Sequence, residues 1–201
     1  MKNAVMALVL GLLVLPGLPV QGQVAWDAPM MVSPSAPAGW GVYLSDPSPG
    51  GGIGVFSSWR PGGPFGFRIG LAEDPLEKLS VFGGVDFSGR LLRESEDFPL
   101  DVDWVTGAGF GIGDTSLVSF PFGASIGREL ETDGIWFNPY LTPRIVLDAY
   151  FGEDPPTDAL SLGLGVDLGM DVVFDPGWAV RVAGSFGDRR ALALGISFRV
   201  F

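Results

Sequence analysis

The chain has 201 residues with 12 lysines and arginines against 23 aspartates and glutamates, which gives a formal net charge of −11. A chain this acidic lacks the clustered lysines and arginines that contacts with nucleic-acid phosphates require. We therefore expect no nucleic-acid partner. Cysteine and histidine are both absent, which excludes disulfides, thiolate or imidazole zinc sites and nucleophiles activated by histidine. We therefore expect neither an enzyme nor a bound cofactor.

Residues 1–22 have the pattern of a secretory signal peptide. Lys2 supplies the positive start, residues 4–15 are an apolar run too short to span a bilayer, and Val20-Gln21-Gly22 offers a cleavage site. Residues 23–38 contain three prolines and show no periodicity. We predict an extended N-terminal segment there.

From residue 39 onward the chain alternates between apolar and small or polar residues. In residues 160–174 every even position is apolar, whereas the odd positions are nearly all serine, glycine or aspartate. This period of two is typical of β-strands, and turn-forming residues separate successive stretches. Ten strands fit best and eight remain possible, with predicted ranges 39–46, 51–60, 65–73, 79–92, 102–113, 116–130, 135–151, 160–174, 178–187 and 190–201.

The composition of the polar face indicates which face is inside. A water-exposed face would be rich in lysine, glutamate and threonine, but here glycine, alanine and serine predominate, with isolated arginine and aspartate. Small side chains suit the interior of a narrow barrel whose apolar face contacts lipid. We predict an all-β, closed antiparallel up-and-down transmembrane β-barrel of eight to ten strands over residues 39–201. A soluble lipocalin-like carrier is the alternative.

The inward positions carry charges of both signs. We expect them to pair and to close the lumen, because an unpaired buried charge is costly; a narrow ion path is the alternative. Arg144 and Arg181 are the candidate partners of Asp148, Asp167 and Asp171. The predicted luminal network consists of Arg68, Asp86, Asp103, Arg144, Asp148, Asp167, Asp171, Arg181 and Arg199, with Arg60 beside it.

Tryptophans gather near one end of the predicted barrel. Trp40, Trp59, Trp104 and Trp178 lie at strand ends that an up-and-down topology brings to the same rim. Amphipathic indoles favour the lipid headgroup level, so we predict membrane-interface positions for these residues and for Phe201.

Residues 39–201, with their alternating strands and the C-terminal ISFRVF, resemble the small outer-membrane β-barrels of the OmpX-like and OmpW-like class. The resemblance implies an even number of strands, both termini on the periplasmic side, contact with outer-membrane lipids, and recognition of the terminal Phe201 by the barrel-assembly machinery. It implies a location in the outer membrane.

Two acidic clusters lie in connections on the opposite side. Divalent cations could bridge them to lipid phosphates, although simple solvation is the alternative; the clusters are Glu73, Asp74 and Glu77, and Glu153, Asp154 and Asp158. Short connections and a filled lumen favour a structural, envelope-integrity protein over a small-solute channel.

Overall fold

The computed structural model describes residues 24–46, 52–73, 78–113, 115–152, 159–175 and 177–199. In these ranges no helix is long and apolar enough to cross a membrane. The regular structure is entirely strand: β1 (Gly39–Asp46), β2 (Gly54–Arg60), β3 (Phe65–Glu73), β4 (Leu79–Leu92), β5 (Asp101–Ile112), β6 (Ser116–Gly127), β7 (Leu130–Thr132), β8 (Ile135–Phe151), β9 (Leu160–Asp175), β10 (Trp178–Gly187) and β11 (Ala191–Phe198).

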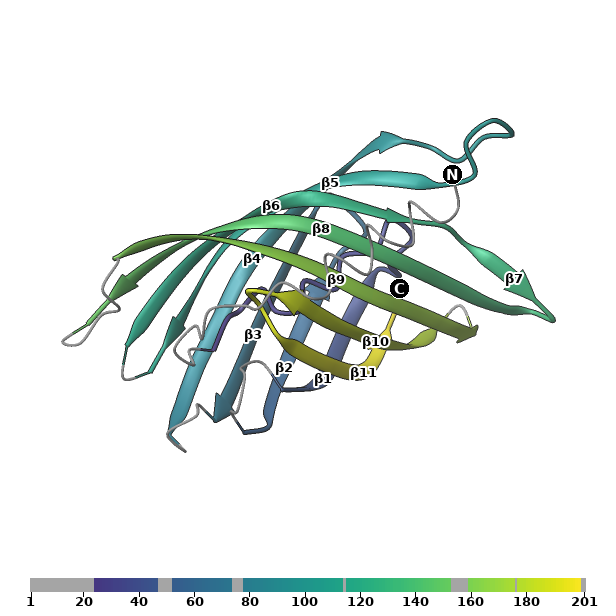
Figure 1. Cartoon of the computed structure of the whole chain (residues 1–201). Helices are drawn as coiled ribbons and strands as arrows, with labels where there is room; N and C mark the ends of the chain where they lie inside the picture. Colours follow the sequence, from purple (N-terminus) through teal and green to yellow (C-terminus); the bar gives the residue numbers. More distant parts are fainter. Residues whose placement is uncertain are drawn as a thin grey trace.

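The strands form one closed antiparallel barrel (Figure 1). Sequential strands are neighbours, and the first and last, β1 and β11, pair with each other from Trp40–Phe198 to Asp46–Leu192. On the other side β6 pairs with β8, and the short β7 pairs with β8 in the same register. β7 therefore prolongs β6 beyond Arg128 and Glu129, and the barrel has ten strands, as the sequence predicted.

The strand bounds agree closely with the predicted ranges. Five predicted ranges, including 135–151 and 178–187, are reproduced at both ends. The differences are at the edges of others: the predicted 116–130 is interrupted after Gly127, and the last strand ends at Phe198. We call the end where β1 starts and β11 finishes the near rim, and the opposite end the far rim.

The outer surface is apolar from strand to strand. Leu162 is 69% exposed, Leu164 58% and Ile69 55%, and each belongs to an alternating outward row. Soluble monomers rarely expose apolar patches beyond a few hundred Å². The inward rows carry the small and charged residues instead, which is the reverse of the arrangement in a lipocalin. The structure is therefore a transmembrane β-barrel, and the soluble-carrier alternative fails.

Leu164→Arg tests the lipid-facing assignment. The arginine would place a charge in the apolar outer row and should lower the free energy of unfolding in lipid by about 2–4 kcal/mol. Gly165→Ser is the control, because a Cβ on Gly165 would meet Arg144 only at ordinary contact distance, 3.7 Å. Urea unfolding in vesicles measures both, and equal losses would contradict the assignment.

Candidate functional site: the occupied lumen

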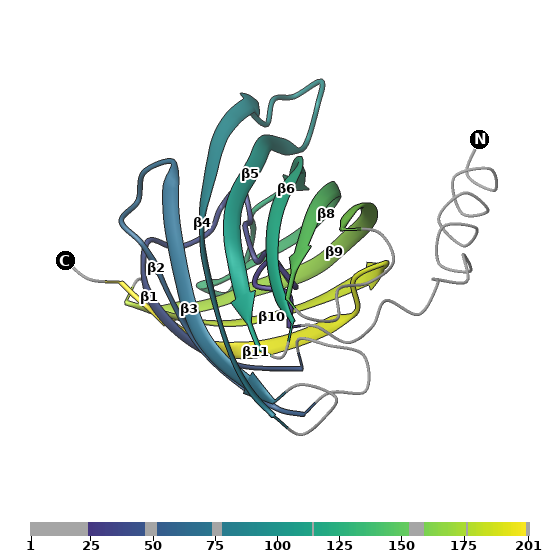
Figure 2. The same cartoon turned by 90° about the vertical axis from the view of Figure 1, so that its left-hand side faces the viewer.

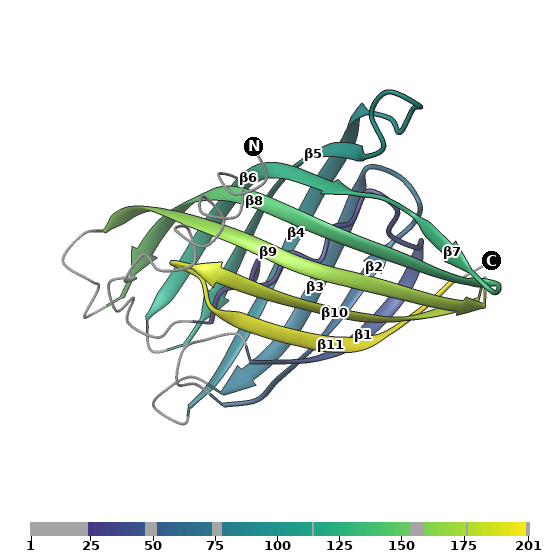
Figure 3. The same cartoon turned by 45° about the vertical axis from the view of Figure 1, so that its right-hand side comes forward.

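The barrel encloses its own N-terminal segment. Residues 24–37, here called the luminal segment, run inside the strands before the chain enters β1 (Figures 2 and 3). Residues 24–33 are all buried, with Trp26 and Met30 each 1% exposed and Asp27 fully buried. The sequence predicted an extended segment but did not place it in the lumen.

Arginines of the barrel donate hydrogen bonds to the backbone carbonyls of the luminal segment. The segment has two short turns but no strand partner, so most of its carbonyl oxygens lack a backbone donor, and burying them unpaired would cost free energy. A guanidinium offers five donors and can satisfy several at once. The pairs are Arg68 to the oxygens of Trp26 (3.1 Å), Pro29 (2.6 Å) and Met30, Arg90 to Pro34 (3.0 Å), Arg144 to Asp27 (3.1 Å) and Arg181 to Met31 (2.9 Å).

Neutral side chains complete this contact toward the near rim. The Ser125 hydroxyl donates to the Val32 oxygen at 2.6 Å. The Asn138 amide donates to the Ser35 oxygen at 3.2 Å. The luminal segment is therefore bound along its length by barrel side chains.

Asp27 lies at the centre of the most deeply buried ion network. Its carboxylate pairs with Arg144, and its other oxygen lies 3.5 Å from Arg189 Nη2. Arg144 Nε also contacts Asp167 Oδ2 at 2.9 Å, and Asp167 accepts the Met30 N–H at 3.2 Å. Arg144, Asp27 and Asp167 have fully buried side chains, so removing Arg144 would leave two buried carboxylates without the cation that they share.

Eight of the nine residues of the predicted luminal network are buried: Arg68, Asp86, Asp103, Arg144, Asp148, Asp167, Asp171 and Arg181. Their ion pairs are Arg181–Asp171 at 2.7 Å, Arg144–Asp167 at 2.9 Å, Arg90–Asp103 at 2.6 Å, Arg189–Asp148 at 2.5 Å and Arg60–Asp86. Arg199 is the exception. It follows the last residue of β11 and is exposed, so it lies outside the buried network.

Three partners in these ion pairs were missed from the sequence, namely Arg90 near the end of β4, Arg189 and Asp27. Arg189 belongs to the connection between β10 and β11, which the sequence identified only as a turn. It pairs with the Asp148 carboxylate, for which the sequence predicted Arg144 or Arg181 as the partner. Asp27 lies in a segment with no periodicity. Its apolar neighbours Trp26 and Met30 were the available signal, since such residues are seldom left in water.

Glycines of the barrel wall form a flat surface for the Trp26 indole. A Cβ on Gly84 would lie 2.3 Å from the indole, and one on Gly109 or Gly107 would lie 2.5 or 2.7 Å from it. The ring also donates from Nε1 to the Ser119 oxygen at 3.3 Å. The sequence predicted that these glycines line a narrow barrel. In the structure, the glycines at 107–113 also leave space for the luminal segment.

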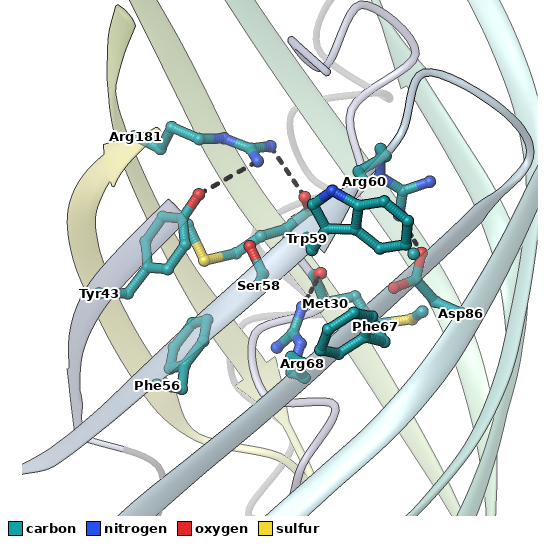
Figure 4. A pocket seen from close by; sticks show the side chains of 12 residues that line it. Met30, Tyr43, Phe56, Ser58, Trp59, Arg60, Phe67, Arg68, Asp86 and Arg181 are labelled. Carbon is teal, nitrogen blue, oxygen red and sulfur yellow. Dashed lines mark hydrogen bonds and ion pairs between the residues drawn. The ribbon is translucent and has the colours of Figure 1, made fainter. Parts of the chain in front are cut away.

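A small pocket lies beside the segment toward the near rim. A cavity of about 20 Å³ lies between Met30, Met31 and β1–β4, bordered by Arg68, Tyr43 and Arg181 (Figure 4). That volume holds about one water molecule.

An aromatic row follows the outside of the near rim. Register places Trp178 opposite Phe198, Phe198 opposite Trp40, and Trp40 opposite Trp59, whose ring lies 5.9 Å from that of Trp40. Trp59 in turn packs against Phe67 at 5.6 Å. Trp104 faces outward near the start of β5, and Phe201 lies outside the described residues.

Most of the acidic residues proposed for cations lie outside the described ranges: Asp74, Glu77, Glu153, Asp154 and Asp158. Glu73 ends β3 and is exposed. Among the described residues no group of three or more carboxylates is arranged to hold a metal ion.

These features define a small transmembrane β-barrel whose lumen holds residues 24–37 of its own chain. No protein-family model matches the chain, and no curated protein matches it. Among solved structures it is similar to a de novo designed transmembrane β-barrel, with 15% identity over 84% of this chain and 100% of that one and a TM-score of 0.39. A bacterial polysaccharide outer-membrane secretin shares 9% identity over 80% of this chain and 58% of that one, with a TM-score of 0.43.

A third similar structure is Ail, the attachment invasion locus protein of Yersinia pestis, solved in complex with the heparin analogue sucrose octasulfate. It shares 11% identity over 81% of this chain and 94% of that one, with a TM-score of 0.26.

Gly84→Ala tests the fit between the barrel wall and Trp26. The added methyl would overlap the indole, and overpacking of this kind costs about 1–3 kcal/mol. In a Trp26→Ala background the same change should cost much less, so the two effects should not add. Gly163→Ala, where the nearest atom is 3.5 Å away, should be nearly neutral. Urea unfolding of the four variants and wild type measures this, and additive losses would contradict it.

Asp27→Asn tests the contribution of the Asp27 carboxylate to docking of the luminal segment. The asparagine keeps the size of the side chain but removes the buried ion pair with Arg144 and the negative charge that lies 3.5 Å from Arg189. The segment should therefore be held less firmly in the lumen.

We expect Asp27→Asn to give ion conductance at pH 7 where wild type gives none. Asp46→Asn, which changes an exposed carboxylate on β1, is the control and should behave as wild type. An Asp27→Asn protein that conducts no more than this control would contradict the role of Asp27 in docking.

Proposed function

We propose that the protein is an integral outer-membrane barrel that contributes to the structure and integrity of the envelope and does not conduct solutes in its resting state. The observation that supports this is the luminal segment, whose Asp27 carboxylate is held by Arg144 and Arg189 in the centre of the barrel. A diffusion channel needs a continuous water-filled path, and the position of the luminal segment inside the barrel argues against one. We propose no enzymatic activity.

The outer-membrane location rests on the apolar outer rows and on the aromatic row at the near rim, which would face the periplasm. Export would depend on residues 1–22, which lie outside the described ranges and stay a predicted signal peptide. Outer-membrane lipids are the proposed partners of the outer surface. Assembly through the C-terminal strand and Phe201 belongs to the same proposal.

A narrow small-solute channel is the second candidate. It requires the luminal segment to leave the lumen. In that case the ion pairs within the wall would remain and would favour a stable empty barrel. These pairs are Arg181–Asp171, Arg189–Asp148 and Arg144–Asp167. The two candidates therefore differ in where the segment resides.

Planar-bilayer conductance distinguishes them. Residues 23–201 should give no stable conductance, whereas the same chain lacking residues 24–35 should conduct, because water would replace the segment. Heat-modifiable migration on a gel should show that both chains form the barrel, and fractionation should place the full chain in the outer membrane. Steady conductance by residues 23–201 would favour the channel.

A further inference from the structure

The barrel wall binds the backbone of the luminal segment. Eight carbonyl oxygens between Trp26 and Ser35 accept hydrogen bonds from side chains of the wall. Every amino acid carries such an oxygen, proline included, so these contacts do not depend on which side chains the segment has. The wall therefore presents a row of donors that fits any peptide backbone following this path. The donors are Arg68, Arg90, Ser125, Asn138, Arg144 and Arg181.

Two side chains of the segment make specific contacts with the wall. The Trp26 indole lies against glycines of β4 and β5 and donates to the Ser119 oxygen at 3.3 Å. The Asp27 carboxylate next to it pairs with Arg144 and lies 3.5 Å from Arg189. Loss of the indole would leave a cavity, and loss of the carboxylate would remove a buried ion pair. The site therefore selects an indole that is followed directly by a carboxylate.

Arg68 directs all of its described hydrogen bonds to the segment. It donates to the carbonyl oxygens of Trp26 at 3.1 Å, of Pro29 at 2.6 Å and of Met30. It is 5% exposed, and none of the ion pairs in the described part of the chain includes it. A buried guanidinium without acceptors costs free energy. The wall thus carries a cation whose hydrogen-bonding partners belong to the occupant of the lumen.

The segment is joined to the barrel wall through residues 34–38, which lead into β1. It runs from Val24, beside Gly111 near the far rim, to Pro34, whose oxygen accepts from Arg90 at the near rim. Residues 34–38 are only partly buried, so this end of the lumen is accessible to water. Apart from the link, the segment makes the noncovalent contacts that a separate peptide would make. The link adds a high effective concentration.

We propose that the lumen is a peptide-binding site, which the chain fills with its own segment and which also binds a peptide of the same chemistry from another protein. In this ligand an indole precedes a carboxylate, and apolar residues follow at the positions of Met30 and Val32, which pack against Val105. Backbone hydrogen bonds supply affinity and the side-chain contacts supply specificity. This binding activity goes beyond the proposed structural role. In the intact chain the tethered segment competes with the partner peptide.

A cut between the segment and the wall tests the proposal on the folded chain. A protease recognition sequence is inserted after Pro37 in residues 23–201, and the protein is cut after it has folded in vesicles. The cut segment should stay with the barrel during native purification and separate on boiling. A synthetic peptide of residues 24–37, with a fluorophore after Pro37, should then replace it with saturable binding measured by fluorescence anisotropy. Uncut protein should bind at least about tenfold less of this peptide, because its own segment is tethered.

Peptide variants separate recognition from nonspecific uptake by the vesicles. The Asp27→Asn peptide loses the ion pair with Arg144, and the Trp26→Ala peptide loses the indole. Each should bind at least about tenfold more weakly than the unchanged peptide. The Ser35→Ala peptide is the matched control, because it keeps every carbonyl oxygen and both specific side chains, and it should bind as the unchanged peptide does. The barrel is the same throughout this series, so its folding does not vary.

Heat-modifiable migration shows whether the cut chain keeps its barrel. If exchange is slow, the cut chain is refolded from urea with a large excess of the labelled peptide, which should then occupy most of the folded barrels. Folded barrels that lack the labelled peptide after this refolding would overturn the proposal, as would failure of the cut chain to refold with the peptide. Equal binding of the Asp27→Asn, Trp26→Ala and Ser35→Ala peptides would also overturn it.

Discussion

The structure depends on one constraint, the need to pair the backbone of an extended segment that is enclosed in a barrel. The strands satisfy their own N–H and C=O groups through the ladder, as membrane spanning requires. The luminal segment has no such ladder. Short backbone turns satisfy the carbonyls of Ala25 and Ser33, and barrel side chains donate to most of the others. The guanidinium of Arg68 alone reaches three of them.

The arginines of the wall therefore serve two kinds of partner. Arg144 and Arg181 each form an ion pair with an aspartate on a neighbouring strand and also donate to a carbonyl of the segment. The wall aspartates fix the guanidinium groups in orientation, and the segment uses the remaining donors. Arg68 differs, because it lies over the Phe56 ring at 5.0 Å and its hydrogen bonds described here all go to the segment.

The sequence predicted the barrel wall well because successive side chains of a strand point to opposite faces, so the hydrophobicity of the residues alternates with a period of two. Residues 160–174 show it without interruption, and β9 occupies Leu160–Asp175. The wall charges were placed inside for the same reason. Partners were harder to predict, because Arg189 belongs to a connection and Asp27 to a segment without regular structure. Neither has a periodic signal, and their positions depend on contacts far apart in the sequence, such as that between Asp27 and Arg144.

The luminal segment changes the number of times that the chain crosses the barrel from even to odd. An even number of strands returns the polypeptide to the side from which it started, so β1 begins where β11 ends. The luminal segment adds one more crossing, made through the middle of the barrel and not through its wall. The chain therefore crosses the barrel an odd number of times between Val24, which lies beside Gly111 near the far rim, and Arg199 at the near rim.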